Sequence, residues 1–206
     1  MSLMQILQDL SSAFSFAADL IVRAHLTDPT GTPTNTPDIR AFMTEAAVLK
    51  CYIGWERFLE QSFAHYMLGA ASTTGKKVVA YAQPPSIAHA LRMPIGTQRY
   101  MDWGNPQIVL KVADLFLENG EPYKSCISAI LSDLTDMRAI RNAAAHLSTS
   151  TSEQLDKIAL RRLNRAQAGI TVYELVTAPD PSGAGHSLLE SYTGQLAAAA
   201  THIAAA

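Results

Sequence analysis

The sequence has few cysteines, almost no excess of charge and no long apolar run, and each shortage excludes a class of protein. Cys51 and Cys126 are the only cysteines among 206 residues, and neither belongs to a CxxC pair or a Cys/His cluster. A disulfide scaffold and a structural zinc site are therefore not expected. The six histidines are scattered and form no HExxH pattern, so we expect neither a metal nor another cofactor.

The charge balance and the hydropathy restrict the partners further. The net charge is −2, whereas a protein that coats nucleic acid without sequence preference is usually strongly basic. Any contact with nucleic acid is thus expected to be local. No uncharged apolar run approaches the roughly 20 residues that span a membrane, and the start lacks the basic region of a secretory signal. We expect a cytoplasmic protein with no membrane partner.

What the sequence does have is apolar residues at helical spacing over most of its length, and 48% apolar residues in total. Gly/Pro- and Ser/Thr-rich segments separate the periodic stretches. The predicted helices cover residues 3–26, 36–68, 86–91, 106–118, 123–147, 152–164 and 186–204. Ser150 and Glu153 have the spacing of a capping box, which would start the helix at 152–164. Residues 169–177 alternate like a short strand. The fold is therefore predicted to be all-α, a bundle of four to five core helices over residues 1–150 with a C-terminal helical extension, 151–206, packed on the same domain.

The longest predicted helix carries an apolar row at alternating spacings of three and four. Its members share one helix face, and they are Ile39, Phe42, Ala46, Leu49, Ile53 and Phe63. Such a row is typical of a core seam or a dimer interface. Glu56 and Glu60 fall in the same register. The helix after it in the bundle, opened by Asn105-Pro106, has a capping residue and a first-turn proline.

The segment from Arg141 to His146 is the most informative part of the sequence. The apolar row of the helix that precedes it is Ile127, Ile130, Leu134 and Met137, and the next position in the row is Arg141. Burying a guanidinium group is costly unless something pairs with it. We therefore expect Arg141 to face a carboxylate, a bound anion or a wet cleft. An arginine can hold two phosphate oxygens, and a histidine can exchange a proton near neutral pH.

Arg141, Asn142 and His146, late in a helix of a mostly helical domain, resemble the signature of the HEPN superfamily: Arg, four to six residues, His, with a polar residue after the Arg. The RiboL-PSP-type branch of prokaryotic defence and toxin–antitoxin systems is the most similar. The segment Trp55-Glu56-Arg57-Phe58-Leu59 is similar to the second helix of the family, where an acidic residue often faces the motif. The resemblance covers about residues 36–150.

The resemblance implies a homodimer with the motif helices at its interface, and an endoribonuclease that needs no metal. On an ideal helix Arg141 and His146 lie about 140° apart and about 7.5 Å along the axis. Because they do not share a face, a two-fold axis would be needed to combine two sets in one cleft. The implied roles are proton transfer for His146, phosphate stabilisation for Arg141 and orientation for Asn142. Glu56 is the candidate partner of Arg138 or Arg141.

The same residues have structural interpretations. His146 at a helix C-terminus is favoured by the macrodipole, and Arg141 can form an ion pair with Glu56 or Asp136. Asn142 and Glu56 can be solvated helix residues. A second function therefore stays open: a non-catalytic HEPN dimer that serves as a protein-interaction or nucleotide-sensing module. The first function is a toxin or defence effector that cleaves RNA and is restrained by an antitoxin or inhibitor protein; a housekeeping RNA-processing enzyme is a third.

Two further features have more than one interpretation. Arg161, Arg162 and Arg165 form a basic cluster that either is a solvated face or grips an RNA backbone. Trp103 precedes a helix cap, where it either packs in the core or stacks on a base.

Overall fold

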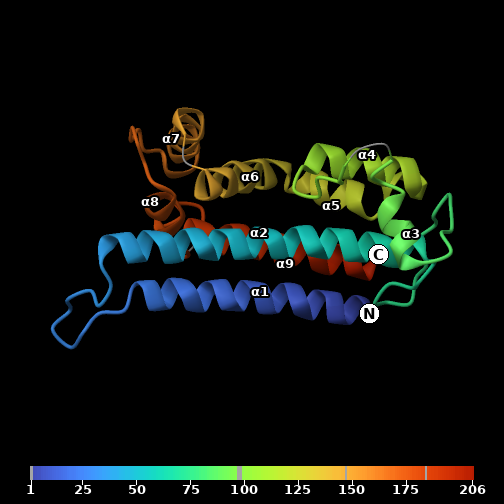
Figure 1. Ribbon diagram of the computed structural model, residues 1–206, viewed down its shortest axis with the longest axis horizontal. Coiled ribbons are helices and arrows are strands. Elements are labelled where there is room, and N and C mark those ends of the chain that lie inside the picture. The colour runs from blue at the N-terminus through green and yellow to red at the C-terminus, as the bar shows by residue number, and fades with distance from the viewer. Residues whose placement is uncertain (1, 97–98, 147, 184) are drawn as a thin grey trace. The chain divides into compact units, whose positions relative to one another are not determined.

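The computed structural model describes residues 2–96, 99–146, 148–183 and 185–206 (Figure 1). Within these ranges it contains nine α-helices, a short 3-10 helix at Glu118–Gly120 and isolated β-bridges, but no strand. The prediction of an all-α fold is therefore confirmed. The helices are α1 (Leu3–Ala24), α2 (Pro37–Met67), α3 (Ile87–Arg92), α4 (Pro106–Phe116), α5 (Tyr123–Ala129), α6 (Leu131–Ala145), α7 (Thr149–Leu163), α8 (Val172–Thr177) and α9 (Leu188–Ala205). None of these helices is both long and apolar enough to cross a membrane.

Local signals set several helix starts where the sequence predicts them. Asn105 accepts a hydrogen bond from the backbone N–H of Gln107, 3.1 Å away, and Pro106 is the first residue of α4. Ser86 caps α3 in the same way, through the N–H of His89. A capping side chain satisfies one of the backbone donors that have no partner within the first turn. Such boundaries depend on a few neighbouring residues, which explains why they can be predicted.

The described residues form two compact units, and four helices, α1, α2, α6 and α9, contribute residues to both. The first unit consists of the described residues of 2–11, 54–135 and 195–206. The second consists of those of 12–53 and 136–194. The second unit contains Arg141, Asn142 and His146.

The core of the first unit is an aromatic cluster around Phe63. Its ring lies 5.4 Å from that of Trp103, 6.0 Å from Phe116 and 6.1 Å from Tyr123. The hydroxyl of Tyr123 lies 2.7 Å from that of Ser62 and is buried. This hydrogen bond matches the requirement that a buried polar atom finds a partner. Trp103 is buried in this cluster, which confirms its interpretation as a packing residue.

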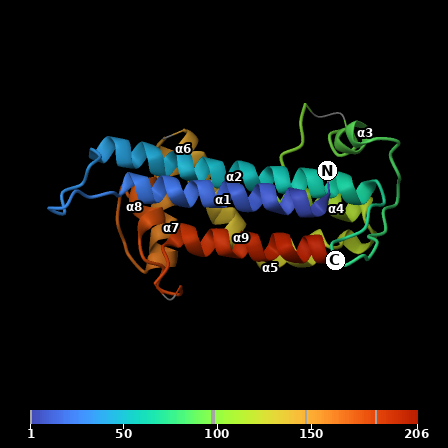
Figure 2. The ribbon, with the colours of Figure 1, turned by 90° about the horizontal axis from the view of Figure 1, so that it is seen from below.

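In the second unit, α1 and α2 run side by side and are joined by a loop over residues 25–36 (Figures 1 and 2). The side chain of Asn35 fixes the end of this loop by donating a hydrogen bond to the carbonyl of Arg23, at 2.8 Å. Lys50 of α2 lies over the ring of Phe16 of α1, 5.5 Å from its centroid. The two helices bury small residues between longer ones, including Ala17 and Ala47.

The strand predicted near residues 170–177 is wrong. Thr171 caps a helix there, and the carboxylate of Glu174 accepts a hydrogen bond from the N–H of Thr171, at 2.9 Å. This capping box starts α8. The buried residues Val172, Leu175 and Val176 follow the three- and four-residue spacing of a helix. The alternation of apolar and polar residues in this segment is equally compatible with a strand. The capping pair Thr171 and Glu174 favours the helix.

The predicted motif helix over residues 123–147 is divided into two. α5 ends at Ala129, and Ile130 leaves the helical conformation with φ −113° and ψ 21° before α6 begins at Leu131. Both sides of the break still bury their apolar row, with Ile127 and Leu134 inaccessible. The predicted end of the helix, Leu147, lies outside the described residues.

The predicted apolar row of α2 is buried only at its last member, Phe63, and is half-buried or exposed from Ile39 to Ile53. Ile39, Phe42 and Ile53 are 47%, 71% and 44% accessible, whereas a neighbouring face of the helix is buried. That buried face includes Val48, Cys51 and Tyr52. The row is thus not a core seam of the chain on its own, and the alternative interpretation as a dimer interface stays open.

Candidate functional site

Two neighbours hold the side chain of Arg141 on α6. Its Nη1 donates a hydrogen bond to Oδ1 of Asn142, at 3.1 Å. Its guanidinium carbon lies 5.8 Å from the ring centroid of Tyr52 on α2, within the range of a cation–π contact. Tyr52 is buried and Arg141 is half-buried. Arg141 is therefore a cation with a supported orientation and access to solvent, as a phosphate-binding arginine requires.

His146 follows the last residue of α6 and is exposed. Its backbone N–H still bonds to the carbonyl of Asn142, at 2.9 Å, so the residue continues the last helical turn. Its own carbonyl accepts a hydrogen bond from the hydroxyl of Thr151, at 3.2 Å. The backbone of His146 is thus fixed between α6 and α7, and its imidazole meets solvent. Ala144 and Ala145, which precede it, leave the helix end uncrowded.

Three of the four predicted site residues lie in one unit and the fourth in the other. Arg141, Asn142 and His146 share the end of α6, whereas Glu56 belongs to the part of α2 in the first unit. Glu56 is half-buried. Its pairing with Arg138 or Arg141 stays a prediction.

A carboxylate that the sequence offers only as an ion-pair partner of Arg141 lies buried one turn before the motif. Asp136 is 1% exposed and forms ion pairs with two arginines of α7, Arg161 and Arg162. The Nε of Arg162 lies 2.7 Å from Oδ2, and the hydroxyl of Tyr192 donates to the same oxygen at 3.0 Å. The guanidinium of Arg162 also lies over the Tyr192 ring, 5.4 Å from its centroid. This cluster joins α6, α7 and α9 in the second unit.

The cluster changes the interpretation of the basic residues of α7. Arg161 and Arg162 neutralise the buried carboxylate of Asp136. This structural role is additional to both earlier interpretations, a solvated face and contact with an RNA backbone. Their side chains remain 54% and 26% exposed, which lets them meet solvent beyond the carboxylate. Asp136 is one of the two carboxylates that the sequence offers for Arg141, and the structure pairs it with α7.

The start of α7 is set by Ser148 rather than by the predicted Ser150. The hydroxyl of Ser148 accepts from the N–H of Thr151 at 3.3 Å, and Thr151 Oγ1 accepts from the N–H of Ser148 at 2.9 Å. The predicted box of Ser150 and Glu153 is therefore wrong by two residues. Threonine replaces the usual glutamate as the second member of the box.

We expect Ser148→Ala to lower the free energy of unfolding by about 1 kcal/mol, because a capping acceptor is lost. Gln154→Ala, at an exposed position of the same helix, is the matched control and should change it by less than about 0.5 kcal/mol. Urea denaturation followed by circular dichroism measures both. Equal losses in the two variants would contradict the assignment of the cap.

His25, at the end of α1, is stacked on Tyr173 of α8. The two rings are 5.4 Å apart with an angle of 7°, and the guanidinium carbon of Arg40 lies 5.9 Å from the centroid of the Tyr173 ring. Nε2 of His25 and Nε of Arg40 are buried and have no hydrogen-bond partner among the described residues. Burial, and secondarily the charge of Arg40, lower the pKa of His25 below its usual 6.5.

A lowered histidine pKa makes stability depend on pH, because the unfolded state binds the proton more readily than the folded state. The contribution is fully present above pH 6.5 and is lost as the pH falls towards the lowered pKa. We expect His25→Phe, which can keep the stacking, to lose less stability than wild type between pH 7.5 and pH 5. Thermal melts across this range measure the difference. His89→Phe, at an exposed site, should follow the wild-type curve.

Among the described residues, no group of three or more His, Cys, Asp or Glu side chains is placed to hold a metal ion. Comparison with known proteins gives no match: neither a family model, nor a curated protein, nor a solved structure is significantly similar to the chain.

Proposed function

We propose that this protein is an endoribonuclease of the HEPN type that cleaves RNA without a metal. The observation that carries the proposal is the end of α6, where a supported arginine and an exposed histidine lie five residues apart. Arg141 rests on Tyr52 and bonds to Asn142, and the backbone of His146 is held by the start of α7. A fixed cation and a proton carrier are the groups that phosphodiester cleavage by an internal nucleophile requires.

The proposed reaction is attack of an RNA 2′-hydroxyl on the adjacent phosphorus. His146 accepts the proton of the hydroxyl as the new P–O bond forms, and Arg141 stabilises the negative charge on the non-bridging oxygens. The bond to the 5′-oxygen then breaks, and that oxygen takes a proton from a protonated imidazole. The products are a 2′,3′-cyclic phosphate and a 5′-hydroxyl. DNA lacks the nucleophile and is not a substrate.

The active form in this proposal is a homodimer. One exposed row favours association: Ile39, Phe42 and Ile53 leave one face of α2 apolar and open to solvent. Large exposed apolar patches often mark interfaces. Tyr52, which supports Arg141, precedes Ile53 in the same helix. A second copy over this face would approach the motif, as the composite cleft requires. Sedimentation measures the oligomeric state of wild type and of Phe42→Glu, a variant that places a charge in the proposed dimer interface.

The biological role that the resemblance suggests is that of a toxin or defence effector restrained by an antitoxin or inhibitor protein. The competing proposal is a non-catalytic dimer that serves as an interaction or nucleotide-sensing module. The contacts of Arg141 with Tyr52 and Asn142 serve that role as well, because they also fix a rigid surface. The two proposals differ in a single measurable property, the cleavage of RNA.

The test is incubation of the purified protein with labelled single-stranded RNA in EDTA, beside DNA of the same sequence. Cleavage of the RNA alone, with cyclic-phosphate ends identified by mass spectrometry, is the expected result. Intact RNA after incubation of several unrelated sequences with a folded dimer would favour the interaction module. Cleavage of both RNA and DNA would contradict the 2′-hydroxyl mechanism.

A further inference from the structure

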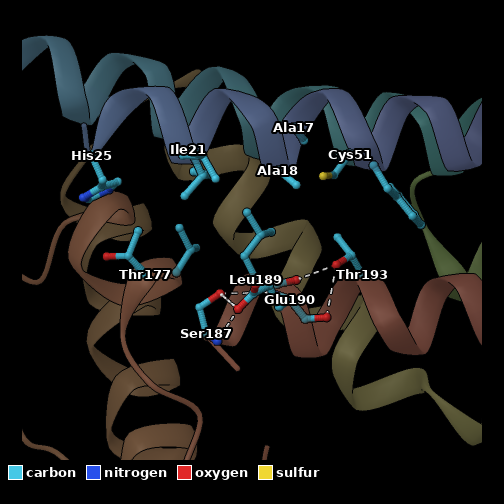
Figure 3. Close-up of a pocket in the computed structure, with 13 residues that line it drawn as sticks. Ala17, Ala18, Ile21, His25, Cys51, Thr177, Ser187, Leu189, Glu190 and Thr193 are labelled. Carbon is cyan, nitrogen blue, oxygen red and sulfur yellow. Dashed lines mark hydrogen bonds between the residues drawn. The ribbon is translucent and has the colours of Figure 1, made fainter. Parts of the chain in front are cut away.

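The second unit contains a pocket of about 380 Å³ between α1 and the α8–α9 segment (Figure 3). None of Arg141, Asn142 and His146 lines it, so it is separate from the proposed catalytic site. Its volume falls within the range of small-molecule sites. Ala17 and Ala18 of α1 leave the space open, and Phe14, Ile21 and Leu189 give it an apolar wall. The pocket therefore suits a molecule with an apolar body.

The hydroxyl groups that line the pocket have already used their protons. Thr177 donates to the carbonyl of Tyr173 at 2.7 Å, and Thr193 donates to the carbonyl of Leu189 at 3.0 Å. Ser187 donates to Oε2 of Glu190 at 2.8 Å. A hydroxyl has one proton and two lone pairs, so each of these oxygens can still accept a hydrogen bond. The polar part of the wall therefore offers acceptors.

Among the described residues, Glu190 supplies the only carboxylate of the wall, and it is ionised near pH 7. The backbone N–H and then the hydroxyl of Ser187 hold the pKa of this carboxyl below its usual value. Both bonds go to Oε2, and Oε1 accepts none among the described residues. The other titratable groups of the wall are neutral near pH 7, since burial lowers the pKa of His25 and raises that of the Cys51 thiol to about 12. The wall thus carries one negative charge and no positive one.

We propose that this pocket binds an organic amine with an aromatic or alkyl body. A protonated amine has three donors and no acceptor, which complements the acceptor oxygens of the wall hydroxyls and the single carboxylate of Glu190. The apolar body fills the space beside Ala17 and Ala18, and the ammonium lies near Glu190. This site does not depend on the proposed RNA cleavage.

Three matched probes test the charge that the pocket selects: phenylbutylamine, phenylbutanol and phenylbutyrate. They share one body and carry a positive, a neutral and a negative head. Calorimetry of the full chain should show tightest binding for the amine and weakest for the acid, at least tenfold apart. Equal binding of all three, or preference for the acid, would overturn the proposal, and so would no binding of the amine at millimolar concentration.

Two substitutions separate the charge from the shape. Ser187 and Glu190 form a capping box at the start of α9. Glu190→Gln keeps this box, because glutamine serves at the same position, and removes the charge. We expect it to weaken amine binding about tenfold and to leave phenylbutanol binding unchanged. Ala18→Leu fills the pocket and should weaken both probes, whereas Ala198→Leu, at an exposed position outside the lining, should weaken neither. Unchanged amine affinity in Glu190→Gln, with the fold intact by circular dichroism, would overturn the assignment of Glu190.

Discussion

Replacing His146 by alanine is expected to reduce the rate of RNA cleavage in EDTA by about 10²–10⁴-fold, the usual contribution of a general acid or base. The substitution should not disturb the fold. The imidazole is exposed, and the bonds that fix this residue use its backbone N–H and carbonyl. Single-turnover cleavage of a labelled RNA measures the loss. His202→Ala, at another exposed histidine of a helix end, is the matched control and should cleave at the wild-type rate.

Arg141 offers a finer test of the same chemistry. Arg141→Ala should lower the rate by about 10²–10³-fold, because the developing phosphorane charge loses its partner. Arg141→Lys keeps the charge but loses the planar fork that can hold two oxygens, so it should recover only part of the rate. A structural arginine would behave differently: the variants would melt at a lower temperature and cleave normally once folded.

The outcome that contradicts the catalytic assignment is clear. If His146→Ala and Arg141→Ala both cleave RNA at the wild-type rate, the activity lies elsewhere in the protein or in a contaminant. If neither they nor wild type cleaves, the interaction module is favoured. Toxicity on expression gives an independent readout, since a toxin should lose its effect with His146 and keep it with His202 replaced.

The elements that could be predicted from the sequence are those whose ends depend on neighbouring residues. α4 begins where Asn105 and Pro106 place it, and α2 begins at Pro37 and ends at Met67. The division between α5 and α6 has no such signal. Ile130 is an ordinary apolar residue, and only in the folded structure does its backbone leave the helical conformation. The face of α2 that is buried could not be predicted either. Both faces carry apolar residues, and packing against α1 selects one of them.

The candidate site divides in the same way. The sequence contains Arg141 and His146 as a local pattern, so their position at a helix end could be predicted. Asp136 belongs to no motif, and its partners are 25 or more residues away. One signal was present: Asp136 shares a helix row with Ile140 and Ala143, both buried. A carboxylate in a buried row requires a cation, and Arg161-Arg162 is the basic pair on the following helix.

Removing the carboxylate of Asp136 is expected to cause the largest loss of stability of any single substitution considered for the second unit. Asp136→Ala leaves the guanidinium groups of Arg161 and Arg162 without their common partner and the hydroxyl of Tyr192 without an acceptor. We expect the free energy of unfolding to fall by about 3 kcal/mol, near the lower end for a broken buried pair. The partial exposure of both arginines lets water solvate them and keeps the loss at that end. The melting temperature should fall by roughly 6–12 °C.

A set of variants distinguishes a charged cluster from simple packing. Asp136→Asn keeps the shape and one carbonyl acceptor, so an intermediate loss indicates that the charge itself contributes. Tyr192→Phe removes only the hydrogen bond to the carboxylate and should cost about 1.5–3 kcal/mol. Asp38→Ala, at an exposed carboxylate of α2, should cost less than about 0.5 kcal/mol.

The double variant Asp136→Ala/Tyr192→Phe then measures whether the two residues act together. In one cluster the hydroxyl loses its hydrogen bond to Asp136 once the carboxylate is gone, so the second substitution should add little to the first. Losses that simply add would mean that Tyr192 and Asp136 stabilise the protein independently.

Because Asp136 lies on the helix that carries the motif, the same variants should also show whether this cluster fixes the orientation of α6. In that case Tyr192→Phe, measured well below its melting temperature, would slow RNA cleavage although Tyr192 is no part of the proposed catalytic set.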